Sequence, residues 1–559
     1  MAYRAPVADL RFLLGSVLGT DRLTASERFA EATGETVDAI LAEAARLAET
    51  VLAPTRRAGD ETPARLENGV VRTSPGFAQA YRAYAEGGWV GLAASPGHGG
   101  MGLPLTLATC VGEMAAGANL ALSLCPLLSQ GAIEALEKHG SDELKALYLP
   151  KLVSGEWTGT MNLTEPQAGT DVGAVRSRAE PGPDGTWRIT GQKIFITWGD
   201  HDIAANICHL VLARLPDAAP GTRGLSLFLV PKRLPDAGGE PGPANSLRVV
   251  SLEHKMGLHG SPTCVMSYEG ATGWLVGAPH GGMAAMFTMM NNARLGVGVE
   301  GVGIAEAAYQ AALAYARERR QGRSPDADEP GIVGFPDVRR MLVAMRAATV
   351  TARAIALDCA FSLDMAAAIG DPAWAARGAL LTPIAKAYGT DTGCEVAALG
   401  VQVHGGMGYI EETGVAQFYR DVRVTPIYEG TNGVQAMDLV GRKLADGGAA
   451  ARALLAEIAA TAAGEPEGRL AAAAAALATA TDWMLAAEPD DRFAGAVPYL
   501  RAFALTLGGH YLVRAAAADH AAWAALRDFH LHRTLTETAG LCAAACEGAA
   551  GLYAVDLAF

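Results

Sequence analysis

The sequence lacks the clustered cysteines that a disulfide framework or a zinc site would need. Its eight Cys residues are scattered over 559 positions. Only Cys542 and Cys546 lie four apart in an Ala-rich helical pattern, and no further ligand is spaced to complete a metal site with them. We therefore expect small buried cysteines, no metal and a reducing compartment.

Net positive charge is also missing, since the formal net charge is −14 at pH 7. A chain of this charge repels a phosphate backbone, so we expect no nucleic-acid partner. One local exception is the basic run 317–323, Arg-Glu-Arg-Arg-Gln-Gly-Arg, which ends a long helical pattern. Such a run fits a solvated helix end, where cations favour the C-terminal dipole, and equally a diphosphate site; the sequence leaves both open.

Segments for export or membrane insertion are not expected either. The first ten residues, Met-Ala-Tyr-Arg-Ala-Pro-Val-Ala-Asp-Leu, carry neither a long apolar core nor a cleavage site, so they do not predict a signal peptide. We expect no membrane span, because we identify no uncharged apolar run close to the length of about 20 residues that a span needs. Hydrophobic residues make up 50% of the chain and charged residues 19%, which suits a well-buried globule in the cytoplasm.

The hydrophobic period divides the chain into four regions. Helical spacing dominates the first; the second has short segments rich in Val, Ile, Thr and aromatics between Gly, Pro and Asp turns; helical patterns return in the third and fourth. The predicted fold is α+β, with an N-terminal α-helical domain (1–155), a middle antiparallel β domain (156–278), a helical-bundle domain (279–445) and an Ala-rich C-terminal helical extension (446–559). The strands of the middle domain could form a sheet or a small barrel. Helices are expected over 37–51, 77–86, 105–116, 129–139, 142–149, 283–319, 338–368 and 383–403. Strands are expected over 157–163, 187–190, 193–197, 207–213, 225–230, 247–252 and 263–268. Within the extension, we expect helix breaks at 464–466, 488–490 and 508–509.

One carboxylate stands out on a glycine-hinged turn. Glu429 follows an apolar run broken by Pro426, and Gly430 and Gly433 come just after it, before a helical pattern resumes. A turn of this kind between two helices can carry a side chain into a cavity. Because most glutamates on loops are solvated surface groups, position alone does not assign Glu429 a catalytic role.

Three further motifs contain groups suited to binding a cofactor. The stretch 161–171, Met-Asn-Leu-Thr-Glu-Pro-Gln-Ala-Gly-Thr-Asp, offers hydroxyls and backbone N–H groups after a strand. In 191–197, Gly-Gln-Lys-Ile-Phe-Ile-Thr, an aromatic and a hydroxyl stand two apart on a strand, hence on one face. In 402–408, Gln-Val-His-Gly-Gly-Met-Gly, two glycines allow close approach of a bound group, and His404 is read as a packed histidine because no acid flanks it. Singly, each motif fits an ordinary turn or core strand better than a site.

In this order and spacing, and together with 420–431, Arg-Asp-Val-Arg-Val-Thr-Pro-Ile-Tyr-Glu-Gly-Thr, the motifs resemble the acyl-CoA dehydrogenase family. The resemblance covers roughly residues 80–444. The N-terminal stretch and the long tail resemble the C-terminally extended subgroup, which includes 3-methylthiopropionyl-CoA dehydrogenases.

The resemblance implies FAD-dependent dehydrogenation of an acyl-CoA thioester to the trans-2-enoyl-CoA. Glu429 would remove the α-proton while hydride passes to flavin N5, with the Glu429 backbone N–H and a flavin ribityl hydroxyl holding the thioester carbonyl. It also implies an electron-transferring flavoprotein as acceptor and a homodimer or homotetramer, with the dimer preferred because the tail would bury a tetramer surface. By position, the implied cofactor residues are Met161, Leu163, Thr164, Gly169, Thr170, Phe195, Thr197, Arg319, Gln402, Gly405, Gly406 and Thr431, and the implied substrate residues are Arg294, Tyr428 and Gly430.

The chain departs from the family pattern at three positions. Gln321 stands before Gly322 where an aromatic is common, which puts an adenine contact in doubt. Gly433 replaces a frequent Gln, and Phe195 replaces a frequent Trp, a tolerable change of ring.

Several alternatives stay open. An acyl-CoA oxidase would use the same residues and pass electrons to oxygen. Medium or long acyl chains would fit the same motifs, although the subgroup resemblance favours a short or sulfur-containing chain, and with it fatty-acid or dimethylsulfoniopropionate degradation. A non-catalytic flavoprotein or CoA-binding scaffold is disfavoured by the intact motifs, and an Ala-rich helical interaction protein by the sheet region.

Overall fold

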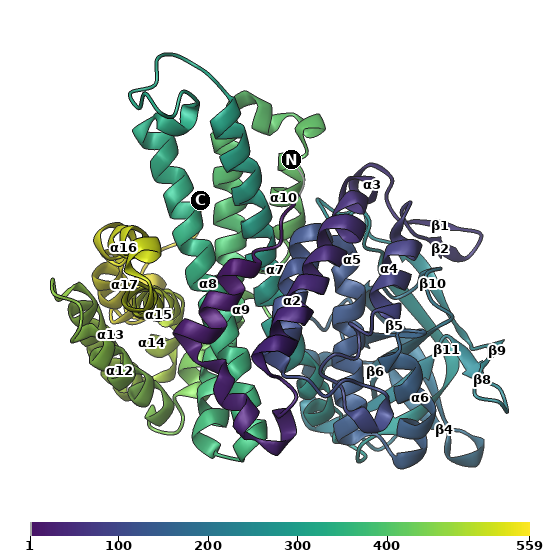
Figure 1. Ribbon diagram of the computed structural model, residues 1–559. Helices are drawn as coiled ribbons and strands as arrows, with labels where there is room; N and C mark the ends of the chain where they lie inside the picture. Colours follow the sequence, from purple (N-terminus) through teal and green to yellow (C-terminus); the bar gives the residue numbers. More distant parts are fainter. Residues whose placement is uncertain (1–2, 559) are drawn as a thin grey trace. The chain divides into compact units, whose positions relative to one another are not determined.

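The computed structural model, drawn as a ribbon in Figure 1, describes residues 3–558. The chain falls into two compact units. Unit 1 comprises Met1–Ala45, Pro104–Gly117 and Arg294–Phe559, and unit 2 comprises Arg46–Leu103 and Ala118–Ala293. The four sequence-derived domain boundaries stay predictions. Residues 1, 2 and 559, at the ends of the first and last predicted domains, lie outside the described residues.

A seven-stranded sheet forms the centre of unit 2. Its strand order is β10-β11-β5-β4-β6-β3, and β7 pairs with both β6 and β11. Fully buried apolar side chains such as Ile189, Val211 and Phe228 fill its core. The strands are β3 (Trp157–Asn162), β4 (Arg178–Pro181), β5 (Trp187–Thr197), β6 (Asn206–Arg214), β7 (Leu225–Pro231), β10 (Leu247–Leu252) and β11 (Thr263–Val276).

The middle β domain is confirmed, but its sheet is mixed rather than antiparallel throughout. Strand β3 runs parallel to β6, with Trp157 opposite Asn206. Parallel neighbours need a long crossover connection, which the chain between them supplies by passing through β4 and β5. The sequence pattern locates strands, but it does not fix the direction of partners that are distant in the chain.

Strand β5 is continuous where two strands were expected. Gly191 lies inside it at φ +155°, and a Cβ there would lie 2.2 Å from the Ser177 Oγ. Glycine at this position is therefore what allows the neighbouring chain to approach closely.

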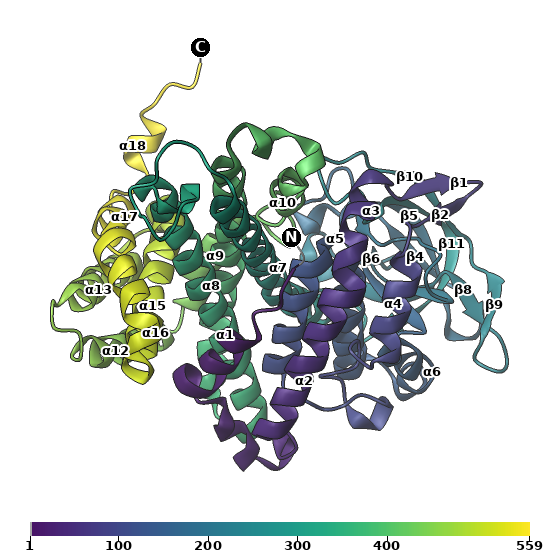
Figure 2. The same cartoon turned by 45° about the horizontal axis from the view of Figure 1, so that its top comes forward.

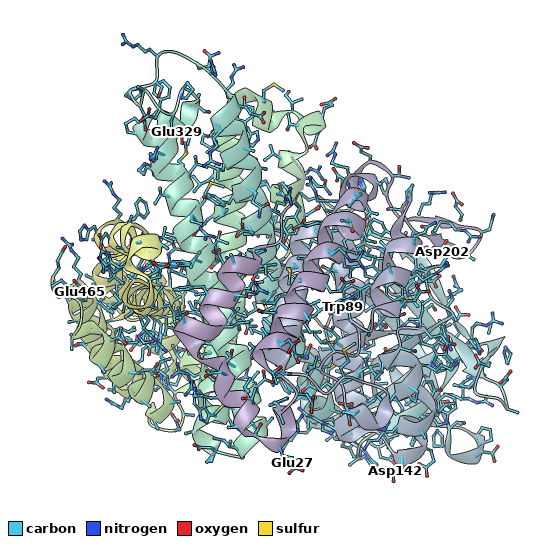
Figure 3. The ribbon with its side chains drawn as sticks, in the orientation of Figure 1. Glu27, Trp89, Asp142, Asp202, Glu329 and Glu465 are labelled. Atoms are coloured by element: carbon cyan, nitrogen blue, oxygen red, sulfur yellow. The ribbon has the colours of Figure 1, made fainter. Side chains whose placement is uncertain are left out.

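The first region is not wholly helical, because it contains a two-stranded hairpin in unit 2. The segment after the hairpin is held by Asp202, which is labelled in Figure 3. The Asp202 carboxylate accepts hydrogen bonds from the Thr73 N–H (3.2 Å) and hydroxyl (2.7 Å). The remaining elements of unit 2 are β1 (Arg65–Glu67), β2 (Val70–Arg72), β8 (Arg233–Pro235), β9 (Pro241–Ala244), α3 (Arg56–Glu61), α4 (Phe77–Glu86) and α6 (Asp142–Val153).

Helix α5 (Leu105–His139) replaces two expected helices. It bends at Asn119 (φ −156°, ψ 92°), whose side-chain oxygen accepts a hydrogen bond from the Leu122 N–H. This helix is long and apolar enough to cross a membrane, with a mean hydropathy of 1.4 over an 18-residue window. The prediction that no apolar segment is as long as a membrane span was therefore wrong for α5. Because 83% of that window is buried inside the protein, α5 has the character of a core helix.

Unit 1 is helical, and its long helices match the expected ones closely except at one start. Helices α7 (Gly282–Glu318) and α8 (Pro336–Ile369) begin and end within two residues of the prediction. Helix α9 (Pro372–His404) starts eleven residues before the expected Pro383. The true start signal was Asp371 followed by Pro372, since the Asp371 carboxylate accepts from the Ala373 N–H at 2.8 Å.

The C-terminal extension is helical, and its helices α15 and α16 pack beside α8 (Figure 2). The break expected at Gly508-Gly509 was wrong, because both glycines lie buried inside α15. A Cβ at Gly508 would lie 3.0 Å from Thr351 of α8, so the glycine permits close helix packing there. The helices are α12 (Ala449–Ala462), α13 (Arg469–Ala486), α14 (Pro489–Ala494), α15 (Ala496–Ala518), α16 (His520–Phe529), α17 (Glu537–Ala545) and α18 (Ala550–Tyr553).

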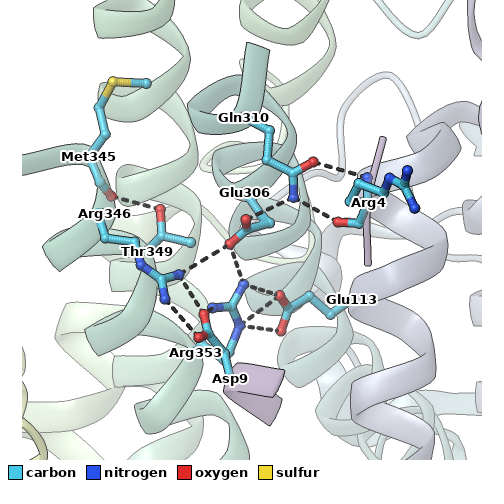
Figure 4. A network of polar contacts seen from close by, with 9 residues as sticks. All are labelled: Arg4, Asp9, Glu113, Glu306, Gln310, Met345, Arg346, Thr349 and Arg353. Atoms are coloured by element: carbon cyan, nitrogen blue, oxygen red, sulfur yellow. Dashed lines mark hydrogen bonds and ion pairs between the residues drawn. The ribbon is translucent and has the colours of Figure 1, made fainter. Parts of the chain in front are cut away.

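A buried ion network joins four helices of unit 1 (Figure 4). Arg353 of α8 is fully buried and donates to Glu113 of α5 (2.6 Å) and Glu306 of α7 (2.7 Å). It also donates to Asp9 of α1 (Val7–Phe12) at 3.1 Å, and Arg346 donates to the same carboxylate at 2.7 Å. The N-terminal helix is thus tied to the long helices by charge as well as by packing.

Candidate active site

Glu429 lies on a turn, residues 423–431, between α10 (Val415–Val422) and α11 (Asn432–Asp438). Glu429 itself has φ +56°, in the left-handed region that non-glycine residues rarely occupy. The Thr431 hydroxyl caps α11 by accepting from the Val434 N–H at 3.2 Å. The turn therefore presents one half-buried carboxyl from a strained position that its neighbours must hold in place.

Two cations of unit 1 influence the Glu429 carboxyl. Burial raises the pKa of Glu429 to about 7, although Arg294 of α7 and Lys386 of α9 act in the opposite direction. A carboxyl with a pKa near 7 is ionised in a large fraction of molecules at neutral pH and is still basic enough to accept a proton from a weak acid.

The three predicted substrate residues lie around this carboxyl. Arg294 is buried and forms an ion pair with Asp438 at 3.5 Å. Tyr428 donates a hydrogen bond to Glu300, a buried acid on α7. Gly430 has φ +86°, and its carbonyl accepts a hydrogen bond from Lys386 at 2.9 Å.

Sequence reasoning missed Lys386 and Glu300. Lys386 was detectable, because it is the one cation within the apolar pattern Thr-Pro-Ile-Ala-Lys-Ala-Tyr of residues 382–388. Glu300 carried no signal, since its partner Tyr428 lies 128 residues away in the chain.

In unit 2, the predicted cofactor residues after β3 lie in a loop. A buried ion pair between Lys193 and Glu165 anchors this loop to β5. Lys193 of β5 donates to the Leu163 carbonyl (2.9 Å) and to the Glu165 carboxylate (2.8 Å). Burial raises the pKa of Glu165, but Lys193 and the backbone donors beyond it outweigh this effect and bring the value to about 2. The Ile194 N–H also donates to the Thr164 carbonyl at 3.0 Å, so the loop is fixed against β5.

The loop and β5 leave several groups accessible. Phe195 is 58% exposed and has φ +60°, at an irregularity in the β5–β11 register. Bulges of this kind recur beside functional sites, where they redirect a side chain. The other predicted residues here are half-buried (Met161, Leu163, Thr164, Thr197) or exposed (Gly169, Thr170).

The remaining predicted cofactor residues gather at a different place in unit 1. Arg319, Gln402, Gly405 and Gly406 are exposed at the C-terminal ends of α7 and α9, which Tyr315 and His404 join by a ring stack of 4.3 Å. Gln402 lies 16 residues beyond Lys386 on one helix, which is about 24 Å at 1.5 Å per residue. These residues are therefore far from Glu429, whereas Thr431 is close to it. His404 is packed, as expected, and its Nδ1 donates to the Gly400 carbonyl at 2.7 Å.

The residues of unit 2 suit a flavin. An exposed aromatic ring in a strained backbone, accessible threonine hydroxyls, and open space at the Cβ position of Gly169 form a surface that a flat, polar-edged ring can cover. For a metal the described residues offer no group of three or more His, Cys, Asp or Glu. All eight cysteines are free, and six are buried.

Comparisons with known proteins agree with this arrangement. Sequence models of the acyl-CoA dehydrogenase N-terminal, middle and C-terminal domains match residues 34–156, 160–271 and 280–445, and an acetyl-CoA dehydrogenase C-terminal-like model matches 451–556. The chain is 49% identical over 519 residues to 3-methylmercaptopropionyl-CoA dehydrogenase of Ruegeria pomeroyi, covering 89% of this chain and 88% of that protein. It is 35% identical over 461 residues to a butyryl-CoA dehydrogenase of Syntrophomonas wolfei, covering 79% and 75%.

A solved structure extends the likeness to the tail. Caenorhabditis elegans ACDH-11, in complex with C11-CoA, matches with a TM-score of 0.80 at 21% identity, over 96% of this chain and 92% of that one, and therefore shares the fold. With a relative 49% identical over most of its length and matching models along nearly all of it, the chain belongs to the acyl-CoA dehydrogenase family of FAD-dependent oxidoreductases.

Proposed function

We propose that this enzyme oxidises a short acyl-CoA, with 3-methylmercaptopropionyl-CoA as the first candidate, and that Glu429 is the base. The substrate proposal is supported by the 49% identity to the Ruegeria enzyme of that name. The assignment of the base is supported by one observation above others, the strained Glu429 turn with two cations of unit 1 acting on its carboxyl.

The chain's own groups account for the proton transfer. Glu429 takes the α-proton of the thioester, and Arg294 and Lys386 stabilise the carboxylate that must be present beforehand. The Glu429 backbone N–H donates to no group among the described residues, so it is available to the thioester oxygen as negative charge develops there. Such a donor is typically worth about 3–4 kcal/mol in a dry site. When bound, FAD supplies the hydride acceptor, and residues 161–170 with Phe195 and Thr197 would hold it.

The partners follow from the same assignment. An electron-transferring flavoprotein is the proposed electron acceptor and a homodimer the proposed assembly. The dimer is supported by Arg319, Gln402, Gly405 and Gly406, which are exposed far from Glu429 and fit contacts to the cofactor of a second copy. The cytoplasm is the proposed location.

A panel of acyl-CoA thioesters tests the substrate assignment. We expect the yellow flavin to bleach fastest with 3-methylmercaptopropionyl-CoA and butyryl-CoA, and kcat/KM to fall at least about tenfold for chains of twelve carbons, because each misfitting methylene costs on the order of 1–3 kcal/mol. An optimum at long chains would overturn the substrate proposal, and the absence of bleaching with every thioester would overturn the activity. Rapid peroxide release with substrate would identify an oxidase.

Replacing Lys193 by Met tests the cofactor loop. We expect the dissociation constant for FAD to rise at least about tenfold, because the buried Glu165 carboxylate loses its partner and the loop loses its anchor. Flavin fluorescence quenching on titration of the FAD-free protein measures this. Lys151→Met is the matched control: that lysine of unit 2 also pairs with two acids, Glu156 and Glu240, but at the surface, where such pairs contribute about 0–1 kcal/mol. Equal FAD affinity in both variants would contradict a role of the loop.

A further inference from the structure

The backbone of Glu429 needs support from outside the turn. A non-glycine residue in a sparsely populated region costs about 1–3 kcal/mol and persists only where surrounding contacts fix it. Within the turn, Ile427 and Tyr428 donate to the Val424 carbonyl, and the Asn432 N–H donates to the Pro426 carbonyl at 3.0 Å. This last bond spans Glu429, but among the described residues the Glu429 N–H itself donates to no group. Side chains of α7, α9 and α11 supply further supporting contacts.

On one side of Glu429, Lys386 of α9 holds the chain. Its fully buried ammonium donates to the Gly430 carbonyl (2.9 Å) and to the Asn432 side-chain oxygen (2.9 Å). The Asn432 amide nitrogen in turn donates to Asp391 at 2.7 Å. A single cation thus bonds both to the residue after Glu429 and to the first residue of α11.

On the other side, Glu300 of α7 holds Tyr428. The tyrosine hydroxyl donates to one oxygen of the Glu300 carboxyl, and the other oxygen has no partner among the described side chains. Burial raises the pKa of Glu300 to about 8, so the group is mostly neutral at pH 7. From α11, the Gln435 amide donates to the Glu429 carbonyl at 3.2 Å. The residues on both sides of Glu429 are therefore held by separate helices.

We propose that Lys386 and Glu300 are positioning residues of the reaction: Lys386, through Gly430 and Asn432, and Glu300, through Tyr428, fix the strained backbone that aims the Glu429 carboxyl, and Lys386 also supplies the positive charge that favours its ionised form. This rests on the proposed function of Glu429 as the base. It goes further by assigning two buried groups that need not touch substrate or cofactor.

Several charged groups influence the ionisation of the Glu429 carboxyl, so the effect of Lys386 has to be distinguished from theirs. The titratable and charged groups around it in unit 1 are Arg294 and Glu300 of α7, Lys386 and Asp391 of α9, Tyr428 of the turn, Asp438 of α11, and Arg442 beyond it. Among these groups, Lys386 combines a positive charge with two hydrogen bonds to the chain beside Glu429.

The test compares Lys386→Met with the wild-type holoenzyme. We expect flavin reduction by acyl-CoA at pH 7 to slow at least about tenfold, and the pH midpoint of its rate to rise by about one pH unit, because an opposite charge nearby favours the ionised carboxyl. The same midpoint is read without turnover from the infrared carboxyl band of Glu429 in FAD-free protein, identified as the band that Glu429→Gln abolishes. Lys386→Arg keeps the charge, so its midpoint should stay close to the wild-type value.

A matched pair tests Glu300. In Glu300→Gln the amide oxygen can still accept from Tyr428, so the rate should stay within about twofold, since hydrogen bonding is kept and a neutral group replaces a mostly neutral one. In Glu300→Ala the acceptor is lost, and the maximal rate should fall at least about tenfold. Equal rates in the two variants would overturn the assignment of Glu300.

The remaining variants control for loosening of the fold. Arg377→Met removes another largely buried cation of unit 1, paired with Asp358 at 2.6 Å, and should lower stability without moving the midpoint. A midpoint that moves equally in this variant, or that stays fixed in folded Lys386→Met, would refute the inference about Lys386. If Lys386→Met does not fold, Asn432→Ser serves in its place, because it removes the side-chain oxygen that accepts from Lys386. This variant should lower the maximal rate of flavin reduction and leave the pH midpoint unchanged. An unaltered maximal rate in Asn432→Ser would also refute the inference about Lys386. The proposed function fails separately, if Glu429→Gln still reduces its flavin.

Discussion

Glu429→Gln is expected to retain FAD and to lose flavin reduction by acyl-CoA, with the rate falling at least about 10³-fold, in the upper part of the range for general-base groups. The amide has nearly the shape of the carboxyl but cannot accept the α-proton, so binding should be largely kept. Stopped-flow measurement of flavin bleaching under anaerobic conditions gives the rate. Glu412→Gln, at an exposed glutamate of the same unit, is the control and should bleach at the wild-type rate.

The rate of flavin reduction should also change with pH in a definite direction. The base must be ionised to act, and burial raises the pKa of Glu429 to about 7. In the wild type the reduction rate should therefore rise as the pH increases through about 7 and level off above it, whereas the residual rate of Glu429→Gln should show no such rise. A reduction rate of wild-type magnitude in Glu429→Gln, or the same pH profile in both proteins, would assign the base elsewhere.

The same group should make the enzyme less stable at high pH. The pKa of Glu429 is raised on folding from its ordinary 4.5 to about 7, so the stability it contributes is fully present below pH 4.5 and is lost as the pH rises through 7. Glu429→Gln cannot ionise and should unfold at a higher temperature than the wild type at pH 8, with a smaller difference at pH 5. A pH-independent difference would contradict the raised pKa.

The candidate site was found from the sequence only where its residues are neighbours in the chain. Glu429, Gly430 and Thr431 stand in one motif, so their order identified them. The contacts that hold Glu429 come from Glu300 and Lys386, which lie on separate helices more than 40 residues away, and no spacing rule connects them. A contact across the fold depends on how helices pack, and a single sequence does not contain that information directly.

The fold shows the same division between local and distant information. Helix α7 was predicted nearly to the residue, because its apolar period persists over 37 residues. The parallel pairing of β3 with β6 and the packing of α15 against α8 at Gly508 were not, because each depends on a partner distant in the chain. Gly508-Gly509 predicts a break by local rules, yet the glycines are placed where a side chain would keep two helices apart.

Arg353→Met is expected to destabilise unit 1 by about 3–5 kcal/mol, the usual cost of removing one partner from a buried ion network. The fully buried guanidinium is bonded to Glu113, Glu306 and Asp9, and Arg346 alone cannot replace it, since it lies 3.8 Å from Glu306 and pairs mainly with Asp9. The thermal midpoint of the holoenzyme, followed by far-UV circular dichroism, measures the loss. Arg340→Met is the control, because that arginine of α8 pairs with Asp337 at the surface, where the expected loss is about 0–1 kcal/mol.

The pH dependence and a double variant separate loss of charge from loss of packing. Burial raises the pKa of Glu113 and Arg353 opposes this, so without the arginine the acid should bind its proton more tightly in the folded state. The deficit of Arg353→Met should therefore be smaller at pH 5 than at pH 8, because a raised carboxyl pKa contributes stability that is lost as the pH rises. Adding Glu113→Gln should recover part of the deficit at pH 8, since the two residues are in contact and their effects are not additive. A deficit that is independent of pH and unchanged in the double variant would mean that Arg353 stabilises the protein by filling space, and that its charge contributes nothing.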